Sequence, residues 1–397
     1  MSVKWSGLSP ELLLSVDRAS SLPLRSQLEE QLRDAIRSGR LRATERLPSS
    51  RVLAQELRLS RGLVQDAYAQ LQAEGYLTSR VGSATQVAST AARPPSPGPT
   101  AIAAPPPLSV DFASGVPDLS LAPRADWAWA VREVCRTAPN TAFDYGDPAG
   151  SPHLRDVLAA YLRRVRAVDA RAAQVLVCSG MAQALNLVFS VVRRRGSALV
   201  GYEDPGPLDT VAAAARASWL PTVPIPVDQH GIDVAALEAS RATGVVVTPA
   251  HQWPTGVVLS AQRRLDLVRW ARRRAGLIIE DDYDAEFRYD REPVGAVQGL
   301  APDCVVSLGT VSKSLSPALR LGWAVLPPSL VAAVTEAKLV ADRGTSGLDQ
   351  LALAALIESG RYDRHLRRMR LEYSGRRDTL VQALDRYAPQ VLSLIHI

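Results

Sequence analysis

Residues 304–323 read CVVSLGTVSKSLSPALRLGW, and the prediction of the fold depends on this stretch. An apolar run at 304–308, typical of a buried β-strand, is followed by small and hydroxyl-bearing residues, by Lys313 and then by Arg320. The chain contains three lysines among its 46 basic residues. A lysine amine can lose its proton and attack a carbonyl group, whereas an arginine stays protonated, so Lys313 is a candidate nucleophile. An exposed lysine between serines is the alternative at this point.

The composition of the 397-residue chain predicts two or three domains with a large apolar core. No apolar run approaches the length of a membrane span, and the N-terminus lacks the pattern of a signal peptide. The cysteines Cys135, Cys178 and Cys304 are scattered, which fits a reducing compartment and gives no support for a metal site. We therefore expect a cytoplasmic protein without a metal, and its net charge of +6 permits nucleic-acid binding.

Residues 22–87 have the pattern of three helices followed by a β-hairpin. Apolar residues spaced four apart, from Leu24 to Ile36, form one face of a first helix, which Gly39 closes. A serine of LPSSR at 47–51 can cap a short second helix, and Ser60 can cap a third. A hairpin around Val81-Gly82-Ser83 follows. This order predicts a winged helix–turn–helix, which places its third helix in the major groove of DNA.

The stretches LPSSR and ELRLSRGLVQDAYAQLQAEGYLTSRVGS resemble the DNA-binding domain of the GntR regulators along its whole length. Charge alone would not decide the matter, because residues 22–87 contain ten arginines against seven acids, a net charge of only +3. A helical core with solvated arginines is the alternative.

The resemblance implies a set of DNA contacts. Arg51 would contact a phosphate at the start of the second helix, and Ser60 would hold another at the start of the recognition helix. Arg61 would read the edge of a guanine. Gly82, at the tip of the wing, would let the backbone approach the minor groove. Gly62 stands where the family usually has threonine or asparagine, so one expected contact is missing.

A proline-rich linker at 89–109 separates the DNA-binding domain at 1–88 from a second domain at 110–397. In the second domain, short apolar runs alternate with amphipathic helical stretches. This alternation predicts a mostly parallel sheet covered by helices on both faces, with ligands bound at the carboxyl ends of its strands. The runs are 175–178, 198–200, 245–247, 277–279, 305–308 and 323–326, and the helices include 182–192, 208–217, 261–275 and 330–340.

Polar residues follow several of these runs. Ser179-Gly180-Met181-Ala182 opens a helix whose free N–H groups suit a phosphate, and TPAHQWPTG at 248–256 forms a loop. Glu280-Asp281-Asp282-Tyr283-Asp284 supplies carboxylates and a phenol, and Lys313 supplies an amine. Pyridoxal phosphate needs an amine for its imine, a carboxylate beside its pyridine nitrogen and donors for its phosphate. An enzyme using a metal and a nucleotide phosphate is less well matched, because the chain has no Walker loop.

Residues 110 to about 390 resemble a fold-type-I, aminotransferase-like domain, and joined to a GntR-type domain they match the MocR/GabR regulators. The resemblance implies that Lys313 carries pyridoxal phosphate as a Schiff base. Asp281 would pair with the pyridine nitrogen, and Tyr283 would donate to the phenolic oxygen of the ring. Phosphate contacts would come from Gly180, Met181, Ala182, Thr310, Ser312 and Arg320, and from Tyr145 of the neighbouring subunit in a homodimer.

The chain departs from the pattern of the family at three places. Pro207, in EDPGP, replaces a common aromatic residue, which puts a ring-stacking contact in doubt. Trp253, in HQWPTG, replaces the asparagine that catalytic aminotransferases have in NPTG, which favours sensing over turnover. The chain stops at Ile397, so we expect an incomplete C-terminal small subdomain that lacks the carboxylate-binding arginine of relatives. The ending SLIHI breaks the helical pattern and is interpreted as foreign or truncated sequence.

The sequence therefore predicts a transcriptional regulator that binds operator DNA and senses a small amine or amino acid by aldimine exchange at Lys313. Two other hypotheses remain open at this point. One is an active aminotransferase with an appended DNA-binding domain, and the other is a degenerate fold used only as a dimerisation scaffold.

Overall fold

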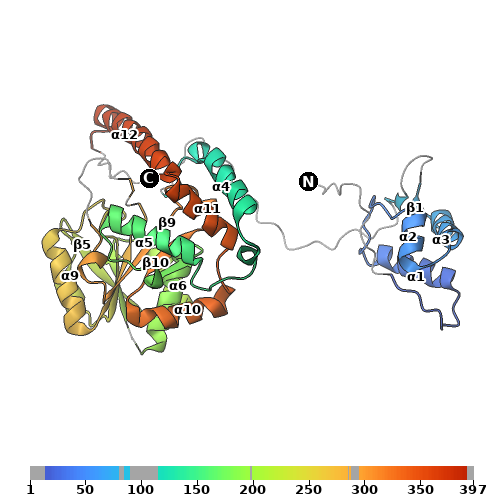
Figure 1. Cartoon of the computed structure of the whole chain (residues 1–397), viewed down its shortest axis with the longest axis horizontal. Helices are drawn as coiled ribbons and strands as arrows, with labels where there is room; N and C mark the ends of the chain where they lie inside the picture. The colour runs from blue at the N-terminus through green and yellow to red at the C-terminus, as the bar shows by residue number, and fades with distance from the viewer. Residues whose placement is uncertain are drawn as a thin grey trace. The chain divides into compact units, whose positions relative to one another are not determined.

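The structure is a computed structural model that describes residues 14–79, 85–89, 115–196, 199–284, 286–287 and 295–390. The chain divides into two compact units, residues 1–109 and 110–397 (Figure 1). Each unit has its own hydrophobic core. None of the helices in the described part of the chain is long and apolar enough to cross a membrane.

The first unit is the predicted winged helix–turn–helix. Ser49 and Ser60 are the N-cap residues of its second and third helices, because their hydroxyl oxygens accept hydrogen bonds from the backbone N–H groups of Val52 (3.3 Å) and Leu63 (3.2 Å). The apolar faces of all three helices meet in one core around Leu28, Leu32, Ile36, Val64 and Leu71. The elements are α1 (Leu24–Arg37), α2 (Ser50–Leu57), α3 (Arg61–Ala73), β1 (Leu77–Thr78) and β2 (Gln86–Val87).

The wing is a short antiparallel hairpin in which Leu77 of β1 lies opposite Val87 of β2. The tip of the wing at residues 80–84, which includes Gly82, lies outside the described residues. Most of the predicted linker, residues 90–109, also lies outside them.

The second unit contains an eight-stranded sheet with the strand order β3-β10-β9-β8-β7-β4-β5-β6. β10 runs antiparallel to both of its neighbours and β6 runs antiparallel to β5, whereas the other neighbouring strands are parallel. The sheet is therefore mostly parallel, as predicted. The strands are β3 (Val175–Cys178), β4 (Val200–Asp204), β5 (Thr222–Asp228), β6 (Gly231–Ile232), β7 (Gly244–Val247), β8 (Leu277–Asp281), β9 (Val305–Thr310) and β10 (Gly322–Val325).

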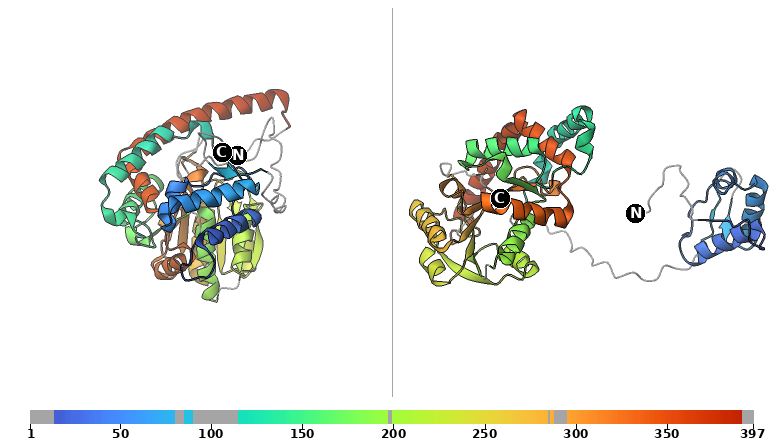
Figure 2. Two further views of the ribbon diagram at one scale, coloured as in Figure 1. Left: turned by 90° about the vertical axis from the view of Figure 1, so that its right-hand side faces the viewer. Right: turned by 60° about the horizontal axis from the view of Figure 1, so that its bottom comes forward.

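Helices cover both faces of this sheet, because alternate residues of its strands point to opposite sides (Figures 1 and 2). Val246, Ile279 and Val306 pack against helices of one face, and Val245, Ile278 and Val305 pack on the other. The first face carries α6 (Met181–Arg194), α7 (Leu208–Ala217) and α10 (Pro328–Asp342). The other face carries α4 (Arg124–Thr137), α5 (Pro152–Arg166), α8 (Val234–Ala239), α9 (Ala261–Arg274), α11 (Gly347–Glu358) and the start of α12 (Arg361–Tyr387).

The register of the strands brings several chain segments together at one edge of the sheet. Cys178 of β3 and Thr310 of β9 both lie opposite Gly322 of β10. Asp281 of β8 lies opposite Leu308 of β9. Because β3, β7, β8 and β9 point the same way, the polar residues that follow them meet at this edge.

Several parts of this unit, β5 and α12 among them, were not named in the prediction from the sequence. The strand β5 contains Pro224 and Pro226, which interrupt the usual pattern of a strand. The helix α12 spans 27 residues, but only its first turns are buried, through Tyr362, His365, Leu366 and Met369. Figure 2 shows it as a long helix that extends past the sheet.

Candidate functional site

Lys313 follows β9 and is half-buried at the carboxyl edge of the sheet. Its Nζ donates a hydrogen bond to the backbone carbonyl of Gly115. Burial lowers the pKa of this amine, and the carboxylates of Asp281 and Asp284 partly oppose the shift. A lowered pKa increases the fraction of neutral amine, which is the nucleophilic form. A Cβ at Gly115, where φ is +91°, would lie only 3.2 Å from this Nζ, so a glycine lets the backbone approach the amine.

Asp281 ends β8 and holds a buried carboxyl group whose Oδ1 has no hydrogen-bond partner among the described residues. Burial is the main cause that raises the pKa of this carboxyl to about 8, and the neighbouring acids Asp282 and Asp284 add to it. Lys313 acts in the opposite direction. A buried carboxyl with a spare oxygen is matched to a cationic N–H group, which would satisfy the oxygen and stabilise its charge.

Tyr283 lies beside this carboxyl and donates a hydrogen bond from its hydroxyl to the backbone carbonyl of His251, at 3.2 Å. Burial raises the pKa of the Tyr283 phenol, so it remains a donor at neutral pH. Nδ1 of His251 lies 2.6 Å from Oδ2 of Asp284, which is almost fully buried. The sequence showed His251 only as part of a loop, and its pairing with Asp284 is a finding of the structure.

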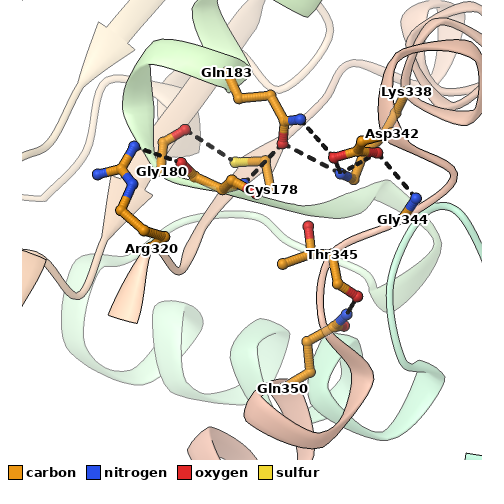
Figure 3. Close-up of polar contacts among 10 residues, drawn as sticks. Cys178, Gly180, Gln183, Arg320, Lys338, Asp342, Gly344, Thr345 and Gln350 are labelled. Carbon is orange, nitrogen blue, oxygen red and sulfur yellow. Dashed lines mark hydrogen bonds and ion pairs between the residues drawn. The ribbon is translucent and has the colours of Figure 1, made fainter. Parts of the chain in front are cut away.

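The turn before α6 has the geometry of an anion-binding site. Gly180 occupies the N-cap position with a φ of +87°, and the first backbone N–H groups of the helix that follows have no partner within the helix. Nη2 of Arg320 donates to the carbonyl of Ser179 at 2.7 Å, and Figure 3 shows this side chain next to Gly180. A Cβ at Gly180 would lie 3.0 Å from the guanidinium, so glycine permits the close approach. The hydroxyls of Thr310 and Ser312 lie 2.9 Å apart at the end of β9, which is separated from β3 by β10.

A second buried carboxyl, Glu203, holds the loop that contains HQWPTG. Its Oε2 accepts hydrogen bonds from the backbone N–H (3.0 Å) and the hydroxyl (2.5 Å) of Thr248, and lies 3.5 Å from Nε2 of Gln252. Burial raises the pKa of Glu203 to about 7. The sequence contained this residue in EDPGP without indicating the contact, because the two loops are about 45 residues apart in the chain.

Tyr145 does not lie among these buried groups. Its side chain is 76% exposed, and Cζ of Arg343 stacks 5.0 Å from the centre of its ring. An exposed position leaves the role predicted for Tyr145, contact with the phosphate of a neighbouring subunit, as a proposal.

The predicted DNA-contacting residues of the first unit lie at the N-terminal ends of α2 and α3. Arg51, Ser60, Arg61 and Gly62 are all exposed there. Ser60 caps α3, and its hydroxyl hydrogen can still be donated to a phosphate. A Cβ at Gly62 would meet no described atom within 4 Å, so nothing in this unit requires the glycine.

Comparison with known families matches both units. Residues 24–87 match the family of bacterial regulatory proteins of the gntR type, and residues 109–396 match the aminotransferase class I and II family. The probable rhizopine catabolism regulatory protein MocR of Rhizobium meliloti is 33% identical over 96% of this chain and 81% of its own length. The pyridoxine biosynthesis transcriptional regulator PdxR of Corynebacterium glutamicum is 32% identical over 94% of this chain and 81% of its own length.

The second unit is similar to solved aminotransferase structures. The multiple substrate aminotransferase of Thermococcus profundus matches with a TM-score of 0.64 and 27% identity over 69% of this chain and 70% of its own. The α-aminoadipate aminotransferase LysN of Thermus thermophilus, solved with N-(5'-phosphopyridoxyl)-L-leucine, matches with a TM-score of 0.63 and 28% identity over 70% of this chain and 72% of its own. These matches confirm the predicted combination of a winged helix–turn–helix with a fold-type-I aminotransferase domain.

Proposed function

We propose that this chain holds pyridoxal phosphate at Lys313 and senses a small primary amine there. The chain belongs to the MocR-type transcriptional regulators, which join a gntR-type DNA-binding domain to an aminotransferase class I and II domain. One observation carries the proposal. A half-buried amine of lowered pKa lies within electrostatic range of a buried carboxyl that has a spare oxygen. Pyridoxal phosphate needs this combination, because its carbonyl carbon bonds to the amine while its pyridine nitrogen pairs with the carboxylate.

The residues of the site fit this cofactor. When bound, pyridoxal phosphate supplies a carbonyl carbon that amines can exchange on and a ring that withdraws electrons. Asp281 would keep a proton on the pyridine nitrogen, and Tyr283 would donate to the phenolic oxygen of the ring. The phosphate would be held by the backbone N–H groups of Gly180, Met181 and Ala182 and by the side chains of Thr310, Ser312 and Arg320.

Lys313 would be the residue whose bonding changes if an effector amine took its place. The released amine can take up a proton, and the carbonyl of Gly115 and the carboxylates of Asp281 and Asp284 are placed to stabilise that charge. Trp253, in place of the asparagine of catalytic aminotransferases, supports sensing rather than turnover. For a sensor, the change at Lys313 has to bias a second state of the protein that differs in its affinity for DNA.

We also propose that the regulator acts as a homodimer in which Tyr145 serves the site of the neighbouring subunit. Its exposed, arginine-stacked ring supports this role. Two DNA-binding units in one dimer would read two half-sites, through Arg61 at the start of each recognition helix and through phosphate contacts from Arg51 and Ser60.

The proposal is tested by measuring DNA binding together with the state of Lys313. A duplex selected from a random pool by the purified protein is labelled, and its affinity is measured by fluorescence anisotropy with the cofactor present, before and after addition of a panel of primary amines. We expect at least one amine to change the affinity of the wild type and of the control variant Lys4→Ala. Lys313→Ala should bind DNA with an affinity that no amine changes. Equal responses of Lys313→Ala and wild type would overturn the proposal.

A further inference from the structure

A buried lysine lies behind the anion-binding turn. Lys338 of α10 is fully buried, in a chain that has only three lysines. Its Nζ lies 2.8 and 3.0 Å from the two carboxylate oxygens of Asp342, one helical turn further on, and 3.2 Å from Oε1 of Gln183 in α6 (Figure 3). A buried ammonium group is costly unless it is paired and hydrogen-bonded, so Asp342 and Gln183 hold the Nζ of Lys338 in this position.

Gln183 carries this interaction to the turn. Its Oε1 accepts a hydrogen bond from the backbone N–H of Ser179 at 2.8 Å, and its Nε2 donates to Oδ2 of Asp342 at 2.6 Å. Both neighbours of Oε1 are donors and the neighbour of Nε2 is an acceptor, so only one orientation of the amide satisfies all three. The carbonyl of Ser179 is bound from the other side by Arg320. Both polar backbone groups of Ser179, directly before Gly180, are therefore held.

Asp342 also reaches in the opposite direction. Its Oδ1 accepts a hydrogen bond from the backbone N–H of Gly344 at 2.9 Å. The residue between them, Arg343, stacks over the ring of Tyr145. One carboxylate thus contacts the lysine, the glutamine that holds the turn, and the backbone beside the arginine that packs on Tyr145.

We propose that Lys338 is a positioning residue for the phosphate of the cofactor. Together with Gln183 and Asp342, it holds the Ser179–Gly180 turn in its anion-binding geometry. The same network connects that turn to the Arg343–Tyr145 pair. Within the described residues, the hydrogen-bond partners of Lys338 are Gln183 and Asp342, so it acts on the phosphate through the turn. A lysine serves here because its ammonium group is compact and can direct three donors to two partners, whereas a guanidinium is a wide planar fork. This inference rests on the proposed function, since it names the phosphate of the same cofactor.

The test compares two ligands that differ only in the phosphate. Equilibrium affinities for pyridoxal phosphate and for pyridoxal are measured by absorbance titration of the full chain for wild type, Lys338→Met and Gln183→Ala. Each variant should bind pyridoxal phosphate about five- to tenfold more weakly, the change that corresponds to one hydrogen bond, and should bind pyridoxal as the wild type does. The double variant should lose about as much as one single variant, because the two side chains act as one unit.

The control is Leu330→Ala, at the other end of the same helix. Leu330 is buried in the core against this face of the sheet, so its truncation destabilises the fold without touching the network. It should leave the ratio of the two affinities unchanged. An equal loss of both ligands in Lys338→Met, or no loss of either, would overturn the inference.

A third ligand separates failure of this inference from failure of the proposed function. Inorganic phosphate needs the turn but not Lys313, so its competition with pyridoxal phosphate, or its direct binding by calorimetry, reports on the turn alone. Wild type that binds inorganic phosphate more tightly than Lys338→Met supports the positioning role even if no bond to Lys313 forms. Equal phosphate binding by the two proteins would contradict it.

Discussion

Replacing Asp281 by asparagine should change stability and cofactor binding in opposite directions. The asparagine keeps the shape of the side chain but removes a carboxyl group that burial keeps protonated. In the folded protein this group ionises with a pKa of about 8, whereas an unfolded aspartate ionises near 3.8. Between these values the unfolded chain has released its proton and the folded chain has not, so rising pH favours unfolding. Above about pH 8 both states are ionised and the penalty is constant.

The size of the effect follows from the difference between the two pKa values. Asp281 lowers the free energy of unfolding by about 2 kcal/mol at pH 5 and by about 5 kcal/mol at pH 8. Asp281→Asn should therefore be more stable than the cofactor-free wild type, with an advantage that grows by about 3 kcal/mol between these pH values. If the free energy of unfolding falls by about 3 kcal/mol per molar urea, this increase in the stability difference shifts the separation of the two urea midpoints by about 1 M. Burial also raises the pKa values of Glu203, Glu280 and Glu286 to about 7, and these three groups are present in both proteins.

Urea denaturation followed by tryptophan fluorescence measures this difference, because six of the seven tryptophans lie beyond residue 110. The same protein samples are then titrated with pyridoxal phosphate, for which Asp281→Asn should lose affinity because it no longer pairs with a protonated ring nitrogen. A stabilised variant that binds the cofactor weakly is the expected result. If Asp281→Asn is less stable than wild type at pH 8, or binds the cofactor as well, the assignment of Asp281 is wrong.

Three further predictions concern other parts of the chain. Arg61→Ala should weaken binding to the selected duplex by about 1–3 kcal/mol and reduce discrimination between bases at one base pair. Anisotropy on a set of duplexes with single-base changes measures both effects, and uniform weakening across that set would contradict a base contact. The fold should tolerate Gly62→Thr, because a Cβ at this position has open space. The variant should bind DNA about fivefold more tightly through one added hydrogen bond, whereas weaker binding would show that the glycine itself is needed. Arg166→Met should lower the free energy of unfolding by about 3–5 kcal/mol, as measured by urea denaturation, because Asp282 stays buried without the guanidinium that binds it at 2.8 Å. Much of this stability should return when Asp282 is also replaced by leucine.

The strand–helix alternation and the residues that follow each strand could be predicted from the sequence because these signals are local. The apolar run at 175–178 is a strand with the same limits, and Leu208–Ala217 is a helix with the same limits. Ser60 caps a helix as predicted, because a serine hydroxyl before an apolar helical face can accept a hydrogen bond from a free N–H group of the first turn. The strand end at Asp281 and the turn at Gly180 could be placed on one edge because parallel strands end together.

Contacts between distant segments could not be predicted, since they depend on how the strands order themselves in the sheet. Glu203 and Thr248 meet because β4 and β7 are neighbours, although two helices and two strands separate them in the chain. Lys338 was visible in the sequence as one of three lysines, but its burial against Gln183 depends on the packing of α10 on α6. A rare residue type in an amphipathic helix was the only signal, and it did not indicate a partner.

We propose above that an amine sensed by this regulator exchanges with Lys313 on a bound cofactor. The most direct measurement is the absorbance spectrum of the protein with pyridoxal phosphate while primary amines are titrated, for wild type and for Lys313→Ala. In wild type we expect a lysine-dependent absorbance band that shifts saturably with at least one amine. In the variant we expect no such band before amine is added. A spectrum of the wild type that matches that of Lys313→Ala throughout the titration would contradict it.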